Sequence, residues 1–155
     1  MNHYTLAQLP GLVGKELAVS DWLLVDQERI NQFAQATDDH QWIHVDVERA
    51  KNGPFGAPIA HGYLTLSLIA GFSQRNVSID DAAMSVNYGL NKVRFPTPVK
   101  VGSRVRARMA LQSCEPISGG PAGKGGFQLV TVVTVEIDGQ AKPACVAETL
   151  RMVYA

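Results

Sequence analysis

The chain has 155 residues, a formal net charge of zero and an apolar fraction of 46%. This length predicts a single domain over residues 1–155 that can bury a core, and the composition is ordinary for a globular protein. Because Lys and Arg form no dense run, the charge pattern argues against nucleic acid and against an anionic membrane surface as the main partner.

The first residues show no basic flank followed by an apolar core, so no signal peptide is predicted. No apolar run approaches the roughly 20 residues that cross a bilayer. The two cysteines, Cys114 and Cys145, lack the spacing of a metal site and suit a reducing compartment. We therefore expect a cytoplasmic protein that does not contact a membrane.

The first elements along the chain are short. Residues 9–17 hold Pro10 and two glycines, so an irregular lead-in is expected, and residues 19–25 fit a short strand. Asp26 fits the N-cap of a helix, because its carboxylate can accept hydrogen bonds from the free amides of the first turn. Apolar residues recur behind it at helical spacing, which predicts a helix through Ala36.

A polar, titratable stretch follows from Ala36 to Asp46, with the sequence ATDDHQWIHVD. It lies between two apolar elements, and such a cluster is where chemistry is first expected. Asp46 fits the N-cap of a second short helix, Val47 to Lys51. The loop 53–58 holds two prolines and two glycines, which predicts a turn with one defined path.

Residues 59–72 predict a longer helix, IAHGYLTLSLIAGF, which is apolar on nearly every side. Other elements should wrap such a helix, because it has no polar face to expose. At ~1.5 Å per residue it would be about 20 Å long, close to the length of the strands that would cover it.

The second half of the chain supplies those strands. They are expected at residues 84–95, 101–111, 127–137 and 144–153. The first places four apolar side chains on one face: Met84, Val86, Tyr88 and Leu90. In the second, Arg104, Arg106 and Arg108 alternate as on the solvent face of a strand, with a phosphate-bearing ligand as the alternative. The pattern predicts an α+β fold in which an antiparallel sheet curls around a central helix.

Three blocks of the sequence together resemble a known family. They are, in order, ATDDHQWIHVD, FGAPIAHGYLTLSL and NYGLNKVRFPTPVKVGSRVRAR. They resemble the MaoC-like, R-specific enoyl-CoA hydratases, and in particular the nodulation-protein-N-like branch, over residues 10–153. The resemblance implies the hotdog fold, in which a curved antiparallel sheet wraps a long central helix, and a homodimer with a continuous sheet.

The resemblance also implies a catalytic pair. The family motif has an Asp, an Asn-Pro pair, an aliphatic residue and a His, and Asp39 and His44 match its Asp and its His. Gln41 and Trp42 stand where Asn-Pro is usual, so this loop lacks the proline restraint. Gly62 matches the family's glycine whose backbone amide faces the thioester oxygen.

Hydration of a 2-enoyl thioester needs a base for water, an acid for C2 and a donor for the enolate-like oxygen. A carboxylate and an imidazole can hold one water and divide the proton transfers. On pattern alone, Asp39 would be a turn cap and His44 a satisfied core histidine; the family blocks favour the catalytic interpretation. Gly62 lies in a first helical turn, where its amide can stabilise an oxyanion or where glycine simply allows close packing.

Further residues are candidates for the substrate site. Tyr88 and Arg94 lie in the third family block, and Arg94 either meets a CoA phosphate or pairs on the surface. His61 precedes Gly62 and is expected to shape the pocket rather than to transfer protons. Trp42 is either a packing residue or a pocket wall.

No metal and no cofactor is expected. His40 to His44 superficially resembles the HExxH zinc motif, but Gln41 replaces its glutamate and no third ligand is evident. Residues 118–126, SGGPAGKGG, have the wrong glycine spacing for a phosphate loop and no Ser or Thr after Lys124, so a hairpin loop is predicted.

The predicted function is a reversible, R-specific 2-enoyl-CoA hydratase that yields (R)-3-hydroxyacyl-CoA. An acyl-CoA thioesterase on the same fold and a non-catalytic acyl-thioester binding protein are the alternatives. Neither alternative requires Asp39, His44 and Gly62 together, so this set favours the hydratase. The sequence leaves open the acyl chain length and the carrier, which is either CoA or acyl carrier protein.

Overall fold

A computed structural model of the chain describes residues 1–120 and 123–155. Within these residues, six strands form an antiparallel sheet in the order β2-β6-β7-β8-β5, with β3 also paired to β6. Their bounds are β2 Glu16–Val19, β3 Leu23–Val25, β5 Met84–Arg94, β6 Ser103–Ile117, β7 Gly126–Ile137 and β8 Cys145–Tyr154. The loop predicted at residues 118–126 joins β6 to β7, and its residues 121 and 122 lie outside the described part.

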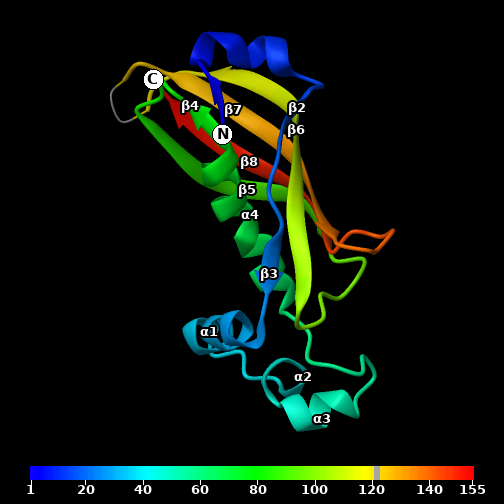
Figure 1. Ribbon diagram of the computed structural model, residues 1–155. Coiled ribbons are helices and arrows are strands. Elements are labelled where there is room, and N and C mark those ends of the chain that lie inside the picture. Colours follow the sequence, from blue (N-terminus) through cyan, green and yellow to red (C-terminus); the bar gives the residue numbers. More distant parts are fainter. Residues whose placement is uncertain (121–122) are drawn as a thin grey trace.

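The longest helix, α4 (Gly62–Asn76), crosses one face of this sheet (Figure 1). Leu64, Ile69 and Phe72 are buried on its sheet-facing side, and they belong to a core cluster that includes Val105 and Val133 of the sheet. Burial of a side chain of this size contributes about 1.5–3 kcal/mol. The arrangement is the one the patterning predicted, with an antiparallel sheet around a central helix.

The start of the central helix differs from the prediction at residue 59. Ile59 bridges Lys100 in extended conformation, and the amide of Ala60 donates to the carbonyl of Val99 at 2.7 Å. These backbone bonds to a distant segment hold the chain extended until the helix begins at Gly62 and runs on to Asn76. Apolar spacing alone could not show them, because the partner residues lie 39 and 41 positions further along the chain.

In the single chain the sheet covers this helix on one side. Leu64 and Phe72 are buried, whereas Tyr63 exposes 70% of its surface. One sheet covers one side of a helix, so the opposite side of α4 faces outward.

The predicted single apolar face of β5 is also wrong. Residues opposite each other in a ladder share a face. Val86 lies opposite Met152, and Leu90 lies opposite Thr149, three positions away on β8. Because three is odd, these two partners are on different faces of the sheet. A register shift directly after Asn87 produces the change, as a β-bulge moves the alternation by one residue.

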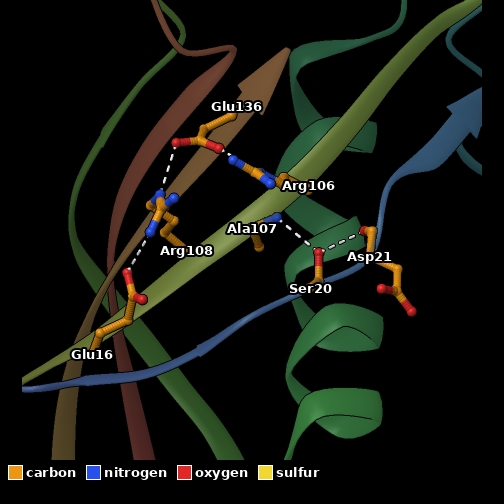
Figure 2. Close-up of polar contacts among 7 residues, drawn as sticks. All are labelled: Glu16, Ser20, Asp21, Arg106, Ala107, Arg108 and Glu136. Carbon is orange, nitrogen blue, oxygen red and sulfur yellow. Dashed lines mark hydrogen bonds and ion pairs between the residues drawn. The ribbon is translucent and has the colours of Figure 1, made fainter. Parts of the chain in front are cut away.

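The strand predicted at residues 19–25 is interrupted and forms β2 and β3. Between them Ser20 remains attached to β6: its amide donates to the carbonyl of Ala107 at 2.9 Å, and its Oγ accepts from the amide of Ala107 at 3.0 Å (Figure 2). The same Oγ donates to the carbonyl of Asp21 at 2.9 Å. The side chain thus replaces ladder bonds where the strand breaks.

The alternating arginines of β6 lie on the outer face of the sheet and pair with carboxylates, and Figure 2 shows two of them, Arg106 and Arg108. Arg106 Nε donates to Glu136 at 2.6 Å, and Arg108 Nε donates to the same carboxylate at 2.9 Å. Arg108 also donates to Glu16 at 2.8 Å, and the third arginine pairs with Asp138. This arrangement agrees with the solvent-face interpretation rather than with a phosphate site.

The remaining elements are short. They are β1 Asn2–Tyr4, η1 Leu6–Leu12, α1 Gln27–Thr37, α2 Trp42–Val45, α3 Val47–Lys51 and β4 Val77–Ile79. Both predicted N-caps are confirmed, since Asp26 accepts from the amide of Arg29 and Asp46 accepts from that of Arg49. The sequence did not predict η1, α2 or the parallel pair β1–β4. Among the described residues, none of the helices has the length and apolar character needed to cross a bilayer.

Candidate active site

The helices α1, α2 and α3 gather at the N-terminal end of α4 (Figure 1). Asp38 ends α1 in the left-handed region, with φ 58°, and is the one non-glycine residue with positive φ among those described. Asp tolerates this region better than most residues. The turn takes Asp39 out of the helix, where 49% of its side-chain surface is exposed.

His44 is held in α2 with its ring oriented by a backbone carbonyl. Only 6% of the residue is exposed, and Nδ1 lies 2.6 Å from the carbonyl oxygen of Ile59. A carbonyl can only accept, so Nδ1 carries the proton in this contact. Nε2 of the neutral ring is then free to accept a proton from a reacting group.

His61 is the N-cap of α4 and links that helix to the loop that carries Asp39. Its Nε2 donates to the backbone carbonyl of Asp39 at 2.9 Å and lies 3.9 Å from Asp39 Oδ2. The His61 ring stacks on the His44 ring, with centroids 3.8 Å apart and planes 25° apart. The residue is 2% exposed. Predicted only as a pocket residue, His61 also contacts both members of the pair.

The surroundings of His44 favour its neutral form. Burial lowers the pKa of His44 most strongly, and the neighbouring His61 lowers it further. The hydrogen bond to Ile59 and the carboxylate of Asp39 act in the opposite direction, but the net pKa is below the ordinary value of 6.5. His44 is therefore available as a proton acceptor near neutral pH.

His44 and Gly62 line one pocket of about 340 Å³. Gly62 is the first residue of α4, where the amides have no partners within the helix, and none of the side chains in the described part of the chain caps this end. A Cβ on Gly62 would lie 3.1 Å from the ring of Phe95, which forms another wall. Glycine at this position therefore keeps the pocket open beside the free amides.

The other predicted substrate residues are placed differently. Tyr88 is 66% exposed on β5 and lines a separate cavity with no wall in common with the pocket of His44. Arg94 is exposed at the end of β5, next to the pocket residue Phe95, and its Nη1 donates to the carbonyl of Val93 at 2.8 Å. Within one chain, neither Arg94 nor Tyr88 lines the pocket of His44, although Arg94 precedes its wall residue Phe95 in the sequence.

Trp42 packs within the helical region instead of lining the pocket. Arg49 lies over its ring at 4.3 Å, and a Cβ on Gly53 would be 2.9 Å from the ring. Trp42 is also the first residue of α2, a position that proline often takes in helices. Packing of the indole against α3 thus holds a turn that a proline would otherwise restrain.

Sequence reasoning missed three parts of the site: the Ile59 carbonyl, the buried Thr65 and Phe95. Thr65 carried a local signal, because it follows Gly62 by one helical turn. His61 was predicted as a pocket residue, but its closeness to the pair was not: Asp39, His44 and His61 offer atoms that lie within 4.8 Å of one another. In both histidines one ring nitrogen is bonded to a backbone carbonyl.

Residues 8–132 match the family model described as MaoC like domain. The chain belongs to this family. It is 49% identical to 3-hydroxyacyl-thioester dehydratase Z of Mycobacterium tuberculosis H37Rv over 146 residues, which cover 94% of this chain and 93% of that protein. It is 45% identical to nodulation protein N of Rhizobium leguminosarum bv. viciae, over 99% of this chain and 93% of that protein.

Among solved structures, R-hydratase PhaJ1 of Pseudomonas aeruginosa matches with a TM-score of 0.77 and 21% identity, over 97% of this chain and 85% of that chain. The resemblance to the MaoC-like hydratases and the α+β hotdog fold are thereby confirmed. The family and its named members support a hydratase or dehydratase activity for this MaoC-like chain.

Proposed function

We propose that this MaoC-like protein is an R-specific 2-enoyl-CoA hydratase, which adds water reversibly to trans-2-enoyl-CoA to give (R)-3-hydroxyacyl-CoA. The observation that carries the proposal is the gathering of Asp39, His44 and the Gly62 amide around the N-terminus of α4. The similarity to a protein named as a 3-hydroxyacyl-thioester dehydratase supports the reaction class.

In the proposed reaction, Asp39 and His44 hold one water between the carboxylate and Nε2. The water oxygen bonds to C3 while the pair takes one of its protons, and the π electrons move to the thioester oxygen. The pair then returns a proton to C2, so that a hydroxyl and a hydrogen have been added across the double bond. His61 holds Asp39 and His44 in position relative to each other, because it bonds to the Asp39 carbonyl and stacks on the His44 ring.

The Gly62 amide is the proposed donor to the enolate oxygen. The free amides and the dipole at the start of α4 favour negative charge there. Removing one such donor typically costs about 3–4 kcal/mol of transition-state stabilisation. The addition of water changes no oxidation state, so the proposal requires no redox cofactor and no metal. Arg94, which precedes the pocket residue Phe95 and is exposed, is the proposed contact for a CoA phosphate.

We further propose a cytoplasmic homodimer formed through β5. This strand is at the open edge of the sheet and is exposed along nearly its whole length, with Val86 and Leu90 at 40% and 46%. An apolar, unpaired strand edge is a surface on which another strand can pair. The outward side of α4, including Tyr63, is exposed as well.

The test follows crotonyl-CoA by absorbance in the enoyl-thioester band beside a thiol-reactive dye, with chiral analysis of the product. Loss of the enoyl band without thiol release, and an R product, are expected. Thiol release from a saturated acyl-CoA would replace the proposal with a thioesterase. Binding without either reaction, on CoA and on carrier-protein substrates of several chain lengths, would indicate a non-catalytic binding protein.

A further inference from the structure

A second cavity, of about 300 Å³, lies between α4 and the sheet, with walls from β5 and β8 and from Leu17, Met109 and Thr131. Leu66 and Ala70 form its helical wall, one position beyond the pocket residue Thr65. It continues along the helix to Ser73, about 10 Å from Leu66 at the helical rise per residue. The proposed hydration chemistry assigns no role to this cavity.

An arginine faces into this cavity from β8. Arg151 lies opposite Leu129, which is 3% exposed, and two positions before the fully buried Val153, so its side chain is on the inner face of the sheet. Its Nε donates to Ser85 Oγ at 2.8 Å. Among the residues that the structure describes, no carboxylate is within ion-pairing distance of Arg151.

This contrasts with the arginines on the outer face, which pair with Glu16, Glu136 and Asp138. Arg151 is half-buried, and this partial burial lowers the pKa of its guanidinium. A partly desolvated charge is stabilised by a partner of opposite charge. The Nη atoms, which hold no hydrogen bond within the described residues, are free to bind a carboxylate as a fork.

We propose that this cavity binds the distal end of the acyl chain and that Arg151 binds a carboxylate there, so that the preferred substrates are ω-carboxyacyl thioesters. The inference rests on the proposed hydratase function, because the thioester end must lie at Gly62. Leu66 to Ser73 are between about 6 and 16 Å from Gly62 along the helix, so only longer chains reach the cavity.

The experiment compares 2-enoyl-CoA substrates of increasing length that end in a methyl group or in a carboxylate. The wild-type protein should prefer the carboxylate once the chain is long enough. Arg151→Met should lower the ratio of kcat/KM, carboxylate over methyl, by at least about tenfold, since charge-assisted hydrogen bonds are the strong ones. Arg104→Met, on the outer face, should leave the ratio unchanged.

A ratio near one at every length in the wild type, or an equal ratio in Arg151→Met, would overturn the proposal and leave Arg151 as a tie between β8 and β5. Arg151→Lys keeps the positive charge but cannot bind a carboxylate through two Nη atoms, and it replaces the Met variant if that variant fails to fold. Its ratio of kcat/KM, carboxylate over methyl, should lie between those of the wild type and Arg151→Met. A wild-type ratio in Arg151→Lys would contradict the two-nitrogen contact.

Calorimetry with saturated acyl-CoA and ω-carboxyacyl-CoA separates this inference from the proposed reaction. These ligands cannot be hydrated, so their binding does not depend on turnover. Tighter binding of the carboxylate form, lost in Arg151→Met, supports the cavity even if no enoyl substrate reacts. Equal binding of both ligands overturns it even if crotonyl-CoA is hydrated.

Discussion

Asp39 is half-exposed, and its own hydrogen bond, accepted from the Gln41 amide, is long at 3.4 Å. Asp39→Asn should therefore fold normally and lose hydration activity by about 10²–10⁴-fold, the usual contribution of a general acid or base. Asp38→Asn is the matched control, because asparagine also tolerates the left-handed conformation at that position. Crotonyl-CoA turnover and thermal melting of both variants test this. Wild-type turnover in Asp39→Asn would remove the residue from the mechanism.

The pKa of His44 gives a pH dependence with a defined sign. Its pKa lies below 6.5, so the neutral, proton-accepting form persists below that pH, and kcat/KM should fall only at lower pH. His61 contributes to this lowering. His61→Gln should therefore raise the pKa of His44 and move the acid limb of the kcat/KM profile to higher pH. If the acid limb of the His61→Gln profile stays at the wild-type pH, His61 does not set the pKa of His44 and has only a packing role.

Gly62→Ala tests whether the pocket needs a glycine. The new Cβ would lie 3.1 Å from the Phe95 ring, so the pocket narrows and kcat/KM should fall by about ten- to a hundredfold. Phe95→Leu in the same background should restore most of the activity. Gly71→Ala in the same helix meets only the flexible end of Arg75 and should keep wild-type activity. Failure of the double variant to recover would mean that the loss comes from a changed backbone amide.

The candidate pair was proposed from the sequence through the family resemblance, but the contacts that orient it could not be predicted. Asp39 and His44 are five positions apart and match the Asp and the His of the family motif, so the resemblance points to them where pattern alone does not. His61 bonds to the Asp39 carbonyl across 22 residues, and Ile59 orients His44 across 15. Both contacts use backbone carbonyls. Every residue has a backbone carbonyl, so the residue types at positions 39 and 59 do not predict these contacts.

At the scale of elements, Glu136 joins two neighbouring arginines on the outer face of the sheet. The hydrogen bond from Arg106, followed by that from Arg108, lowers the pKa of Glu136 below its usual 4.5. A lowered carboxyl pKa adds stability above the unfolded pKa, and that stability is lost as pH falls through the folded value. Glu136→Gln should thus destabilise the protein by about 1 kcal/mol at neutral pH, with the difference vanishing in acid.

Urea unfolding at several pH values measures this effect. Glu115→Gln is the control, because Glu115 is exposed on β6 and forms no ion pair with any residue that the structure describes. A Glu136→Gln difference that stays constant down to acid pH would show that the carboxylate charge is not its source.

The sequence predicted the ends of elements that depend on side chains a few residues away. It did not predict ends that depend on hydrogen bonds to backbone groups far along the chain. Asp26 and Asp46 bond amides three residues ahead, so their helices start where the sequence indicates. The start of α4 depends on the bond between Ala60 and Val99, and the bulge in β5 depends on its register with β8. Such features follow from strand pairing, which apolar periodicity does not encode.

At the scale of the whole molecule, the exposed edge of β5 and the uncovered side of α4 indicate that a single chain is incomplete. A homodimer through β5 would give the edge backbone groups partners and cover apolar side chains such as Val86. Val86→Lys would then place a charge among the apolar side chains that the pairing covers, and burying an unpaired charge is destabilising.

Sedimentation velocity should accordingly give a dimer for the wild type and a monomer for Val86→Lys at the same concentration. Val13→Lys is the matched control: Val13 is 45% exposed and precedes β2, at the opposite edge of the sheet from β5, so this variant should remain dimeric. A dimeric Val86→Lys protein would place the interface away from β5, and a monomeric wild type would refute the homodimer. Because α4 carries both the Gly62 end of the site and the uncovered side, the monomeric variant should also have lower activity than the dimeric control.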